Sequence, residues 1–389
     1  RSRRCRELTD VITAKQEPGH LAGVASAAGR LWLALPVIGL CRRTAHRSFA
    51  ALLAGVVLLL LASAPSLART ITDSAGRLVD VPDKISRVAA AGPPAAVLLY
   101  VLAPQDMIGW VQAPGGDAKP FLLPAVRDLP ELGRLTGHGD AFARDRLIAA
   151  KPDLIIDFGT INETYRLLAE RVQALTGIPY LLIDGRLDNT PAALRLLGDV
   201  LGVKTRGEAL AGAAEQIFST VDRVLAKTPS AARPRIYFAD GADGLQTRAR
   251  DSINTEIIER IGGINVVEGP REKAGPINVG LAQVIAWAPD TIVTLDRDFA
   301  RTVGQSEDWR PVRAVRDRRV FLSPVLPYGF IDTPPSVNRL IGLTWLVHKL
   351  YPEHATGDLR EQVRAFYRLF YQVELSDRDV DRLLAPGGE

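Results

Sequence analysis

The sequence predicts an α/β protein in which two α/β lobes are joined by one long helix. The first observation is an apolar period of three and four residues over 205–227, which is typical of an amphipathic helix. At about 1.5 Å per residue, this helix would reach roughly 35 Å, about the width of a small domain. The second observation is a pattern that occurs once on each side of this helix, at 147–159 and at 284–296. In each copy the end of a helix is followed by Pro-Asp and then by an apolar strand.

The long helix has a defined buried face and a defined end. It stops before Pro229, because proline cannot continue a helix and disfavours helical backbone in the residue before it. The apolar residues that recur on one face are Leu210, Ala214, Ile217, Val221 and Val224.

The two flanking units predict strands that are buried on both sides. Pro152 and Pro289 each end a helix, and the aspartate after each proline turns the chain into a strand. The strands at 154–158 and 291–295 are continuously apolar, as expected of parallel strands covered by helices on both faces. One such unit occurs in every α/β fold, whereas two around a long helix predict two lobes. We therefore expect a leader over 1–68, lobes over 69–204 and 228–389, and a linker helix over 205–227.

Turn and cap residues place the remaining elements. Thr160 or Asn162 is expected to cap a helix at 163–175, and Ser252 or Asn254 one at 255–261, while Ser376 begins a capping box. Further strands are expected at 88–91, 108–111, 180–183, 235–239, 265–267 and 320–322, and further helices at 142–150, 191–201, 281–287 and from 334 onward.

Charge and cysteine content narrow the class of protein. The chain has 389 residues, with 48 Lys and Arg against 44 Asp and Glu. Residues 1–68 hold 9 of the basic and 3 of the acidic groups, which leaves 39 basic and 41 acidic groups in the rest. The basic balance therefore belongs to the leader, and we expect no nucleic-acid partner. Both cysteines, Cys5 and Cys41, also lie in the leader, so the body has neither a disulfide nor a thiol nucleophile.

The leader is expected to carry a secretion signal. Three arginines over 42–47 precede an uncharged apolar run at 49–62, and Ser66-Leu67-Ala68 supplies small residues for cleavage after Ala68. The alternative is a retained membrane anchor, for which this run is short, since a span needs about 20 apolar residues. No cysteine follows the run, so the lipoprotein pattern is missing. Residues 1–40 are interpreted as upstream translated sequence, with the true start nearer Val37.

Motifs of catalysis and metal binding are missing from the body. It has no Gly-x-Ser-x-Gly elbow, P-loop, His-Glu-x-x-His or Cys-x-x-Cys. Its histidines are scattered, and His348 lies in a leucine-rich helix, where packing is the more ordinary role. Asp240 and Asp243 could act as an acid–base pair, but turn residues of this kind are more common. We therefore expect no metal site and no catalysis.

Three loops at strand ends are candidate binding sites. Gly92-Pro93 forms a strand-to-helix corner, where backbone N–H groups can meet a ligand. Arg248 and Arg250 lie in a polar loop, where a guanidinium can hold a carboxylate, catecholate or oxyanion with two hydrogen bonds. Tyr328 and Phe330 lie before a helix and could line a pocket. Each loop also has an ordinary structural interpretation. The Gly92-Pro93 corner could simply cap a helix, the two arginines could be solvated, and the two aromatic rings could cover the end of the sheet.

Two long motifs give the chain a family resemblance. The segments DGLQT…SINTEIIERIGGINVV and PYGFIDTPPSVNRLIGLTWLVHKLYP, with the two Pro-Asp units, resemble the periplasmic substrate-binding proteins of iron-complex ABC transporters over residues 71–352. This family takes up ferric siderophores, haem, cobalamin and, in one branch, molybdate. The resemblance implies a ligand cleft between the lobes, a linker helix at 205–227, an inner-membrane permease as partner, and a periplasmic monomer without an intrinsic cofactor. The ligand it implies is an iron chelate, haem, cobalamin or an oxyanion.

The resemblance also implies positions for binding and docking. The family docks on its permease through an acidic residue in the helix before each Pro-Asp turn, which here is Asp145 in the first lobe. The second position is Ala282, a departure that leaves Glu268 or Glu272 as substitutes. The expected cleft residues are Gly92, Pro93, Trp110, Thr160, Asn162, Arg186, Gln246, Arg250, Ser252, Tyr328 and Phe330.

Two other functions remain open at this point. A two-lobed metal chelatase acting on a tetrapyrrole would need a general base, for which His138 is the candidate. A secretion signal argues against it, because tetrapyrrole metal insertion usually needs a cytoplasmic supply. A non-catalytic surface module would have neither a pocket nor a tightly bound small ligand.

Overall fold

The protein was analysed as a computed structural model that describes residues 68–136, 143–269 and 275–385. The described residues belong to one compact unit, Ser66–Glu389. The predictions for the leader, including its signal peptide, both cysteines and the start near Val37, lie outside the described residues, as do His138 and Glu272. Within the described ranges, no helix is both long enough and apolar enough to cross a membrane.

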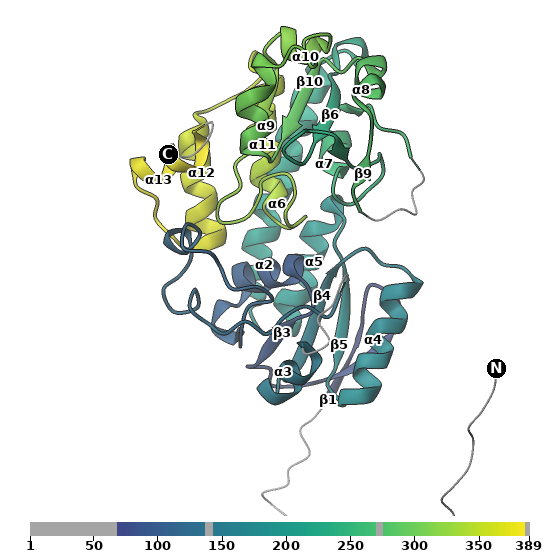
Figure 1. Cartoon of the computed structure of the whole chain (residues 1–389). Helices are drawn as coiled ribbons and strands as arrows, with labels where there is room; N and C mark the ends of the chain where they lie inside the picture. Colours follow the sequence, from purple (N-terminus) through teal and green to yellow (C-terminus); the bar gives the residue numbers. More distant parts are fainter. Residues whose placement is uncertain (1–67, 137–142, 270–274, 386–389) are drawn as a thin grey trace, which may run out of the picture. The chain divides into compact units, whose positions relative to one another are not determined.

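The first lobe is built on a parallel sheet of three strands in the order β3-β4-β5 (Figure 1). Its central strand, β4, is buried from Leu154 to Phe158, as its continuous apolar run predicts. An antiparallel hairpin of β1 and β2 adjoins this sheet through the hydrogen bond from Ser74 N to Leu182 O at 2.8 Å. The elements of this lobe are β1 Ala68–Thr72, β2 Leu78–Pro82, β3 Val88–Ala90, α2 Pro93–Leu102, α3 Ala143–Ala150, β4 Leu154–Gly159, α4 Glu163–Thr176, β5 Tyr180–Asp184 and α5 Thr190–Val200.

The second lobe is built on a parallel sheet of four strands in the order β11-β10-β6-β8. A separate antiparallel pair, β7 and β9, follows β6, and Asp240 and Gln246 form an isolated bridge at the turn between β6 and β7. Three helices at the C-terminal end of the chain complete the described structure. The elements are β6 Arg235–Ala239, β7 Gln246–Thr247, α7 Glu256–Arg260, β8 Ile264–Asn265, β9 Ile277–Asn278, α8 Leu281–Trp287, β10 Thr291–Thr294, α9 Arg297–Thr302, α10 Arg313–Arg316, β11 Val320–Leu322, α11 Arg339–Leu350, α12 Leu359–Phe366, the π-helical turn η6 Tyr367–Tyr371 and α13 Asp377–Leu384.

The two Pro-Asp units perform the same structural task in the two lobes. Asp153 accepts hydrogen bonds from the backbone N–H groups of Ser86 and Arg87 at 2.9 and 3.0 Å. Asp290 accepts from the backbone N–H of Arg235 at 3.1 Å. In each lobe the aspartate begins a central strand and satisfies the N–H groups at the start of the neighbouring strand. The repeated sequence pattern thus corresponds to a repeated structural unit.

The long helix α6 runs over Lys204–Lys227 and links the two sheets (Figure 1). Its predicted apolar face is buried at four of the five positions, and Ile217 is partly buried against the same core. One cluster of buried side chains includes residues of both sheets, such as Ile156 and Phe238, together with α2, α6 and α11. The prediction of two α/β lobes bridged by a single helix is confirmed.

The C-terminal helices tie the lobes together beside α6. The hydroxyl of Tyr100 in α2 donates to the carbonyl oxygen of Tyr371 at 2.8 Å, and their rings lie 5.3 Å apart. Arg206 of α6 donates to the carbonyl oxygens of Leu369 and Phe370 at 2.9 and 3.1 Å. The lobes are therefore joined by side-chain and backbone contacts as well as by the single helix.

Some predicted boundaries are wrong. Residues 108–111 form no strand, and within them only Trp110 forms an isolated bridge, with Glu131. The last long helix begins at Arg339 instead of Pro334, because Pro335 disfavours helical backbone in the residue before it. The cap of α7 is Thr255, without a side-chain hydrogen bond, whereas Asn162 caps α4 by accepting from Tyr165 N at 3.1 Å. The capping box at Ser376 is confirmed.

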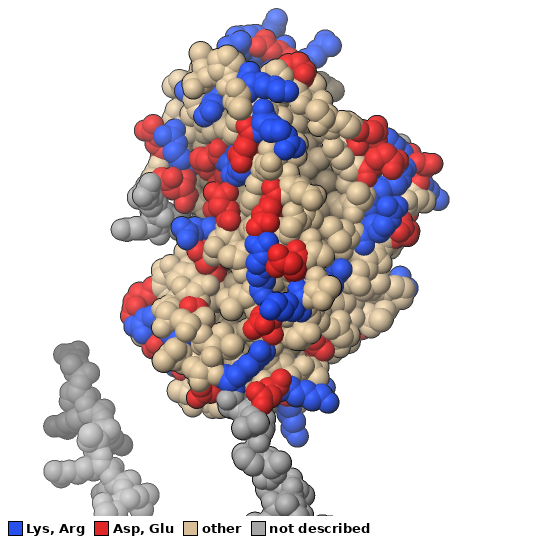
Figure 2. Space-filling model, turned by 180° about the vertical axis from the view of Figure 1, so that it is seen from behind, with Lys and Arg blue, Asp and Glu red and all other residues tan. Residues whose placement is uncertain are grey.

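The rear face of the molecule carries both signs of charge. Figure 2 shows basic and acidic side chains next to one another over this face, without a broad patch of one sign. Opposite charges are also paired between helices, since Arg195 of α5 pairs with Glu208 and Glu215 of α6 at 2.9 and 2.5 Å. A nucleic-acid surface would need clustered positive charge, and this face does not offer it.

Candidate functional site

A cavity of about 620 Å³ lies between the two lobes. First-lobe residues on its wall follow β4 and begin α2, which places the cavity at the carboxyl ends of parallel strands, where α/β proteins bind ligands. The second lobe contributes the loop that follows β7 and the loop that precedes α11. Its volume is within the range of small-molecule pockets, about 300–1,000 Å³. It is the candidate binding site.

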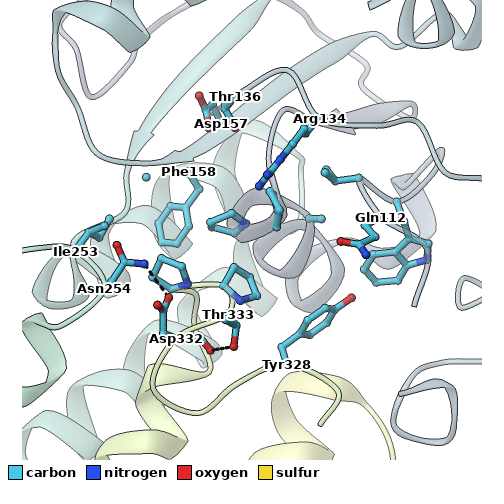
Figure 3. Close-up of a pocket in the computed structure, with 18 of the residues that line it drawn as sticks. Gln112, Arg134, Thr136, Asp157, Phe158, Ile253, Asn254, Tyr328, Asp332 and Thr333 are labelled. Carbon is cyan, nitrogen blue, oxygen red and sulfur yellow. Dashed lines mark hydrogen bonds between the residues drawn. The ribbon is translucent and has the colours of Figure 1, made fainter. Parts of the chain in front are cut away.

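Arg134 is a cationic group on the first-lobe wall. Figure 3 shows its side chain extending toward the middle of the cavity, opposite the ring of Tyr328. Arg134 is exposed and makes neither a hydrogen bond nor an ion pair with another described residue. A guanidinium presents five N–H donors in a planar arrangement that matches carboxylates and oxyanions. Its donors are available to a ligand.

Asp157 gives the same wall an acidic group. It follows three apolar residues of β4, is almost completely buried, and accepts a hydrogen bond from the hydroxyl of Tyr180 at 3.1 Å. Burial raises the pKa of the Asp157 carboxyl to about 6, because desolvation disfavours the ionised form. Burial likewise raises the pKa of Tyr165, which also lines the cavity. Asp157 is therefore a weak acid at the edge of the cleft.

Aromatic and proline side chains form the apolar part of the wall. Trp110 and Tyr328 lie on opposite lobes with ring centroids 6.2 Å apart, and the indole N–H of Trp110 donates to Val126 O at 2.8 Å. Burial raises the pKa of Tyr328, so its hydroxyl remains a donor at physiological pH. The other apolar residues of the wall include Phe158, Pro93, Pro94, Pro327, Pro334 and Pro335.

The second-lobe wall contains an arginine that is already neutralised. Arg248 donates to the Asp240 carboxylate at 2.7 Å, and its Nε lies 3.4 Å from Oδ2 of Asp332. Asn254 donates to Oδ1 of Asp332 at 2.8 Å, as drawn in Figure 3. The Asp332 side chain is 2% exposed, and burial raises its pKa, partly opposed by Arg248. The main partners of Arg248 are therefore carboxylates of the protein, and a ligand would be a secondary contact.

Close backbone packing holds the loop that carries Tyr328 and Asp332. A Cβ on Gly342 of α11 would lie 1.9 Å from the carbonyl oxygen of Phe330, so only glycine fits there. Asn338 donates to the carbonyl oxygen of Tyr328 at 2.9 Å. The cavity wall on this side is therefore fixed by α11.

Four of the residues predicted from the sequence line the cavity, namely Pro93, Trp110, Thr160 and Tyr328. Gly92 lies directly behind it, since a Cβ there would meet the Thr136 hydroxyl at 2.5 Å. The expected N–H donors of this corner are reduced, because the first two helical residues are prolines.

The other predicted residues do not line the cavity and have structural partners within the protein. Asn162 caps α4, Arg186 binds Asp184 at 2.6 Å, and Gln246 pairs with Asn278 in β7. Three more lie elsewhere: Arg250 donates to Asn265 O at 2.9 Å, Ser252 bonds to Asn254, and Phe330 is fully buried in the core.

Sequence reasoning missed Arg134, Asp157, Asn254 and Asp332 as cavity residues. Asp157 could have been noticed as a carboxylate inside an apolar strand, and Arg134 as the charge of a glycine-rich loop. Asp332 stands in a loop among prolines, and nothing local marks its burial.

In the described ranges, no group of three His, Cys, Asp or Glu could hold a metal ion. His348 contacts Gln362 at 2.9 Å, and Asp243 accepts from Leu245 N as a turn residue.

Comparisons with known proteins agree with this geometry. The periplasmic binding protein family matches residues 128–325. The molybdate-binding protein MolA of Haemophilus influenzae is 25% identical over 336 residues, which span 78% of this chain and 91% of MolA.

Solved structures give the same fold. An ABC transporter solute-binding protein of Sulfurospirillum deleyianum is 30% identical, with a TM-score of 0.75, over 81% of this chain and 98% of that protein. A structure of Haemophilus influenzae MolA bound to molybdate is 24% identical, with a TM-score of 0.64, over 79% of this chain and 99% of that one.

Proposed function

This chain belongs to the periplasmic binding protein family, and we propose that it captures a small oxyanion between its lobes for an ABC importer. Members of this family are solute-binding proteins that deliver small ligands to an inner-membrane permease. They bind their cargo and pass it on unchanged, so the role needs no catalytic group. The cavity at the strand ends of both lobes is where such a ligand would be held.

The observation that carries the choice of an oxyanion is the Arg134 guanidinium. It lies on the cavity wall, extends inward and has no partner among the described residues (Figure 3). Hydrogen bonds between a guanidinium and an anionic oxygen are about twice as strong as those between neutral groups. The 25% identical relative, MolA, is named for molybdate, which supports the same class of ligand.

A metal chelate is the second candidate, and the size of the cavity favours it. About 620 Å³ corresponds to roughly 20 water molecules at about 30 Å³ each, far more than one tetrahedral oxyanion displaces. Trp110, Phe158 and Tyr328 offer flat apolar surface that suits an organic chelator. An oxyanion would instead require ordered water or movement of the lobes to fill the space.

We further propose that Asp145 is a contact with the permease. Its side chain is 67% exposed on α3, with Arg144 3.4 Å away, so it is accessible to a basic partner. In the second lobe the corresponding Ala282 offers no charge, and Glu268, 83% exposed, is the candidate substitute. Secretion with cleavage after Ala68, and a monomeric state in the periplasm, complete the proposal.

Titration calorimetry with a ligand panel tests the cargo. The panel contains molybdate, tungstate, sulfate, hydrogenphosphate and a ferric trihydroxamate. Arg134→Ala should weaken oxyanion binding by about 10- to 100-fold, the value of a charge-assisted hydrogen bond. Arg171→Ala, which removes an exposed arginine of α4 that does not line the cavity, is the matched control. Unchanged affinity in the Arg134 variant would refute the oxyanion proposal, and binding of the ferric complex alone would favour the chelate.

A further inference from the structure

Gln112, Arg134 and Tyr328 are polar residues of the cavity wall whose side chains make no hydrogen bond with another described residue. Gln112 and Arg134 are exposed, and the Tyr328 hydroxyl keeps solvent-accessible surface, since it is not one of the buried polar atoms that lack a partner. Figure 3 shows all three side chains pointing into the cavity. Their hydrogen-bond donors are therefore within reach of a ligand.

Backbone pairing in the first lobe brings Gln112 and Arg134 to the same wall. Trp110 and Glu131 form an isolated parallel bridge, and Gln112 follows two residues after Trp110. Arg134 follows three residues after Glu131, and Gly133 before it turns the chain with a φ of 83°, which favours glycine. Two neighbouring segments of one lobe thus present an amide and a guanidinium to one cavity.

Tyr328 brings a hydroxyl to this wall from the second lobe. Its ring centroid lies 6.2 Å from that of Trp110, and its backbone carbonyl oxygen accepts from Asn338 at 2.9 Å. The indole N–H of Trp110 is already bonded to Val126 O, so Trp110 offers no donor of its own. An amide and a phenol are neutral donors, and with one guanidinium they can bind an anion without a second cation.

The two carboxylates of the wall have partners of their own. Asp157 accepts from the Tyr180 hydroxyl, while Asp332 accepts from Asn254 and lies 3.4 Å from Arg248 Nε. Neither carboxylate therefore occupies the donors of the Gln112, Arg134 and Tyr328 group. These donors suit oxyanions that carry no O–H group as well as oxyanions that keep one.

We propose that Gln112 and Tyr328 are ligand-binding residues that complete an anion subsite with Arg134. The Gln112 amide and the Arg134 guanidinium hold the oxyanion from the first lobe, and the Tyr328 hydroxyl donates to it from the second, so that one ligand bridges the lobes. This inference rests on the proposed oxyanion function. Loss of one hydrogen bond to a charged group corresponds to about a 10- to 100-fold loss of affinity.

Calorimetry of the full chain with molybdate, tungstate, sulfate and hydrogenphosphate tests the subsite. Gln112→Ala removes the amide, and Tyr328→Phe removes only the hydroxyl and keeps the ring. The matched controls are Gln305→Ala, which removes an exposed amide, and Tyr351→Phe, which removes a buried hydroxyl bonded to a backbone carbonyl oxygen at 3.0 Å. Neither control residue lines the cavity.

We expect each cavity variant to lose at least about 10-fold in affinity for the most tightly bound oxyanion, with the urea midpoint unchanged, because the removed groups have no partner among the described residues. Gln112→Glu should weaken binding more than Gln112→Ala, since it places a carboxylate of the same shape against the anion. Tyr351→Phe should lower the urea midpoint and keep the affinity, and Gln305→Ala should change neither.

Unchanged affinity in either Gln112→Ala or Tyr328→Phe would overturn the three-residue subsite. If Arg134→Ala weakened binding in the same experiment, the oxyanion function would still stand. Equal affinities of the Gln112→Glu and unmodified proteins would also overturn the subsite, because a carboxylate in contact with the anion must repel it. If the unmodified protein bound none of the four oxyanions, the proposed function would be refuted, and the inference with it.

Discussion

Arg339 of α11 donates a hydrogen bond from Nη2 to the carbonyl oxygen of Gly185, 2.6 Å away at the end of β5, and so joins the second lobe to the first. The side chain is fully buried, and it also donates to Ile253 O at 3.0 Å and to the carboxylate of Glu256. Glu256 in turn accepts from the backbone N–H of Leu187 in the first lobe at 2.6 Å. This ion pair, with a fully buried arginine and a partly buried glutamate, thus contacts both lobes.

Replacing Arg339 with methionine should destabilise the protein strongly. The variant leaves the partly buried Glu256 without its cation. Partial burial already raises the pKa of this carboxyl, and Arg339 opposes that rise. Breaking a buried pair by removing one partner typically costs about 3–5 kcal/mol in the free energy of unfolding, which urea denaturation measures. Adding Glu256→Gln should recover part of the loss. A change below about 1 kcal/mol would contradict this role.

The same contacts predict little closure of the lobes on ligand binding. The helix α6, the Arg339 pair and the Tyr100–Tyr371 contact all hold the two sheets at a fixed separation. Such links oppose the large rotation of a flexible multi-strand hinge. Small-angle scattering should give almost the same radius of gyration with and without bound anion. A pronounced compaction would show that these contacts break on binding.

The fold follows from local patterns that can be recognised in the sequence. The Pro-Asp units, the buried runs around Ile155 and Ile292 and the period of the linker helix each depend on neighbouring residues alone, and each is found in the structure. The helix α11 begins later than the predicted start at Pro334, because Pro335 disfavours helical backbone in the residue before it. Local sequence rules are therefore sufficient to predict the architecture, but they predict the boundaries of individual helices less well.

The binding site depends on contacts between distant residues, and sequence reasoning found it only in part. Trp110 and Thr160 stand at strand ends, where α/β proteins hold ligands, so position alone indicated them. The pairing of Arg248 with Asp332 joins residues 84 positions apart, and no local pattern marks it. Arg250 and Arg186 looked equally suitable because both are loop arginines, and only the folded chain shows that each has a partner elsewhere.

Two glycines of α6 should respond in opposite ways to alanine. A Cβ on Gly207 would lie 2.7 Å from Leu194 O and 3.0 Å from the Cα of Gly198, where α5 and α6 touch, so Gly207→Ala should destabilise the protein. No atom lies within 4 Å of a Cβ on Gly212, so Gly212→Ala should stabilise it by about 0.5–1 kcal/mol. Urea denaturation of both variants checks the pair. Equal effects of the two changes would show that the helix contact is looser than described.

Asp157 should make stability depend on pH in a defined direction. Burial raises its pKa from 3.8 to about 6 in the folded state, so the folded protein holds this proton more tightly than the unfolded chain. The stabilisation that the proton provides is complete at pH values below 3.8 and is lost as the pH rises through about 6. A pKa difference of this size corresponds to about 3 kcal/mol.

Asp157→Asn removes this titration and retains the acceptor for the Tyr180 hydroxyl. Its free energy of unfolding should therefore rise relative to the unmodified protein by up to about 3 kcal/mol between acidic and neutral pH. Glu259, whose pKa is raised to about 7, titrates in both proteins and cancels in the difference. Urea denaturation at a series of pH values, with the exposed Asp145→Asn as control, measures this difference. Parallel stability curves for the Asp157 variant and the unmodified protein would show that Asp157 stays ionised in the folded state.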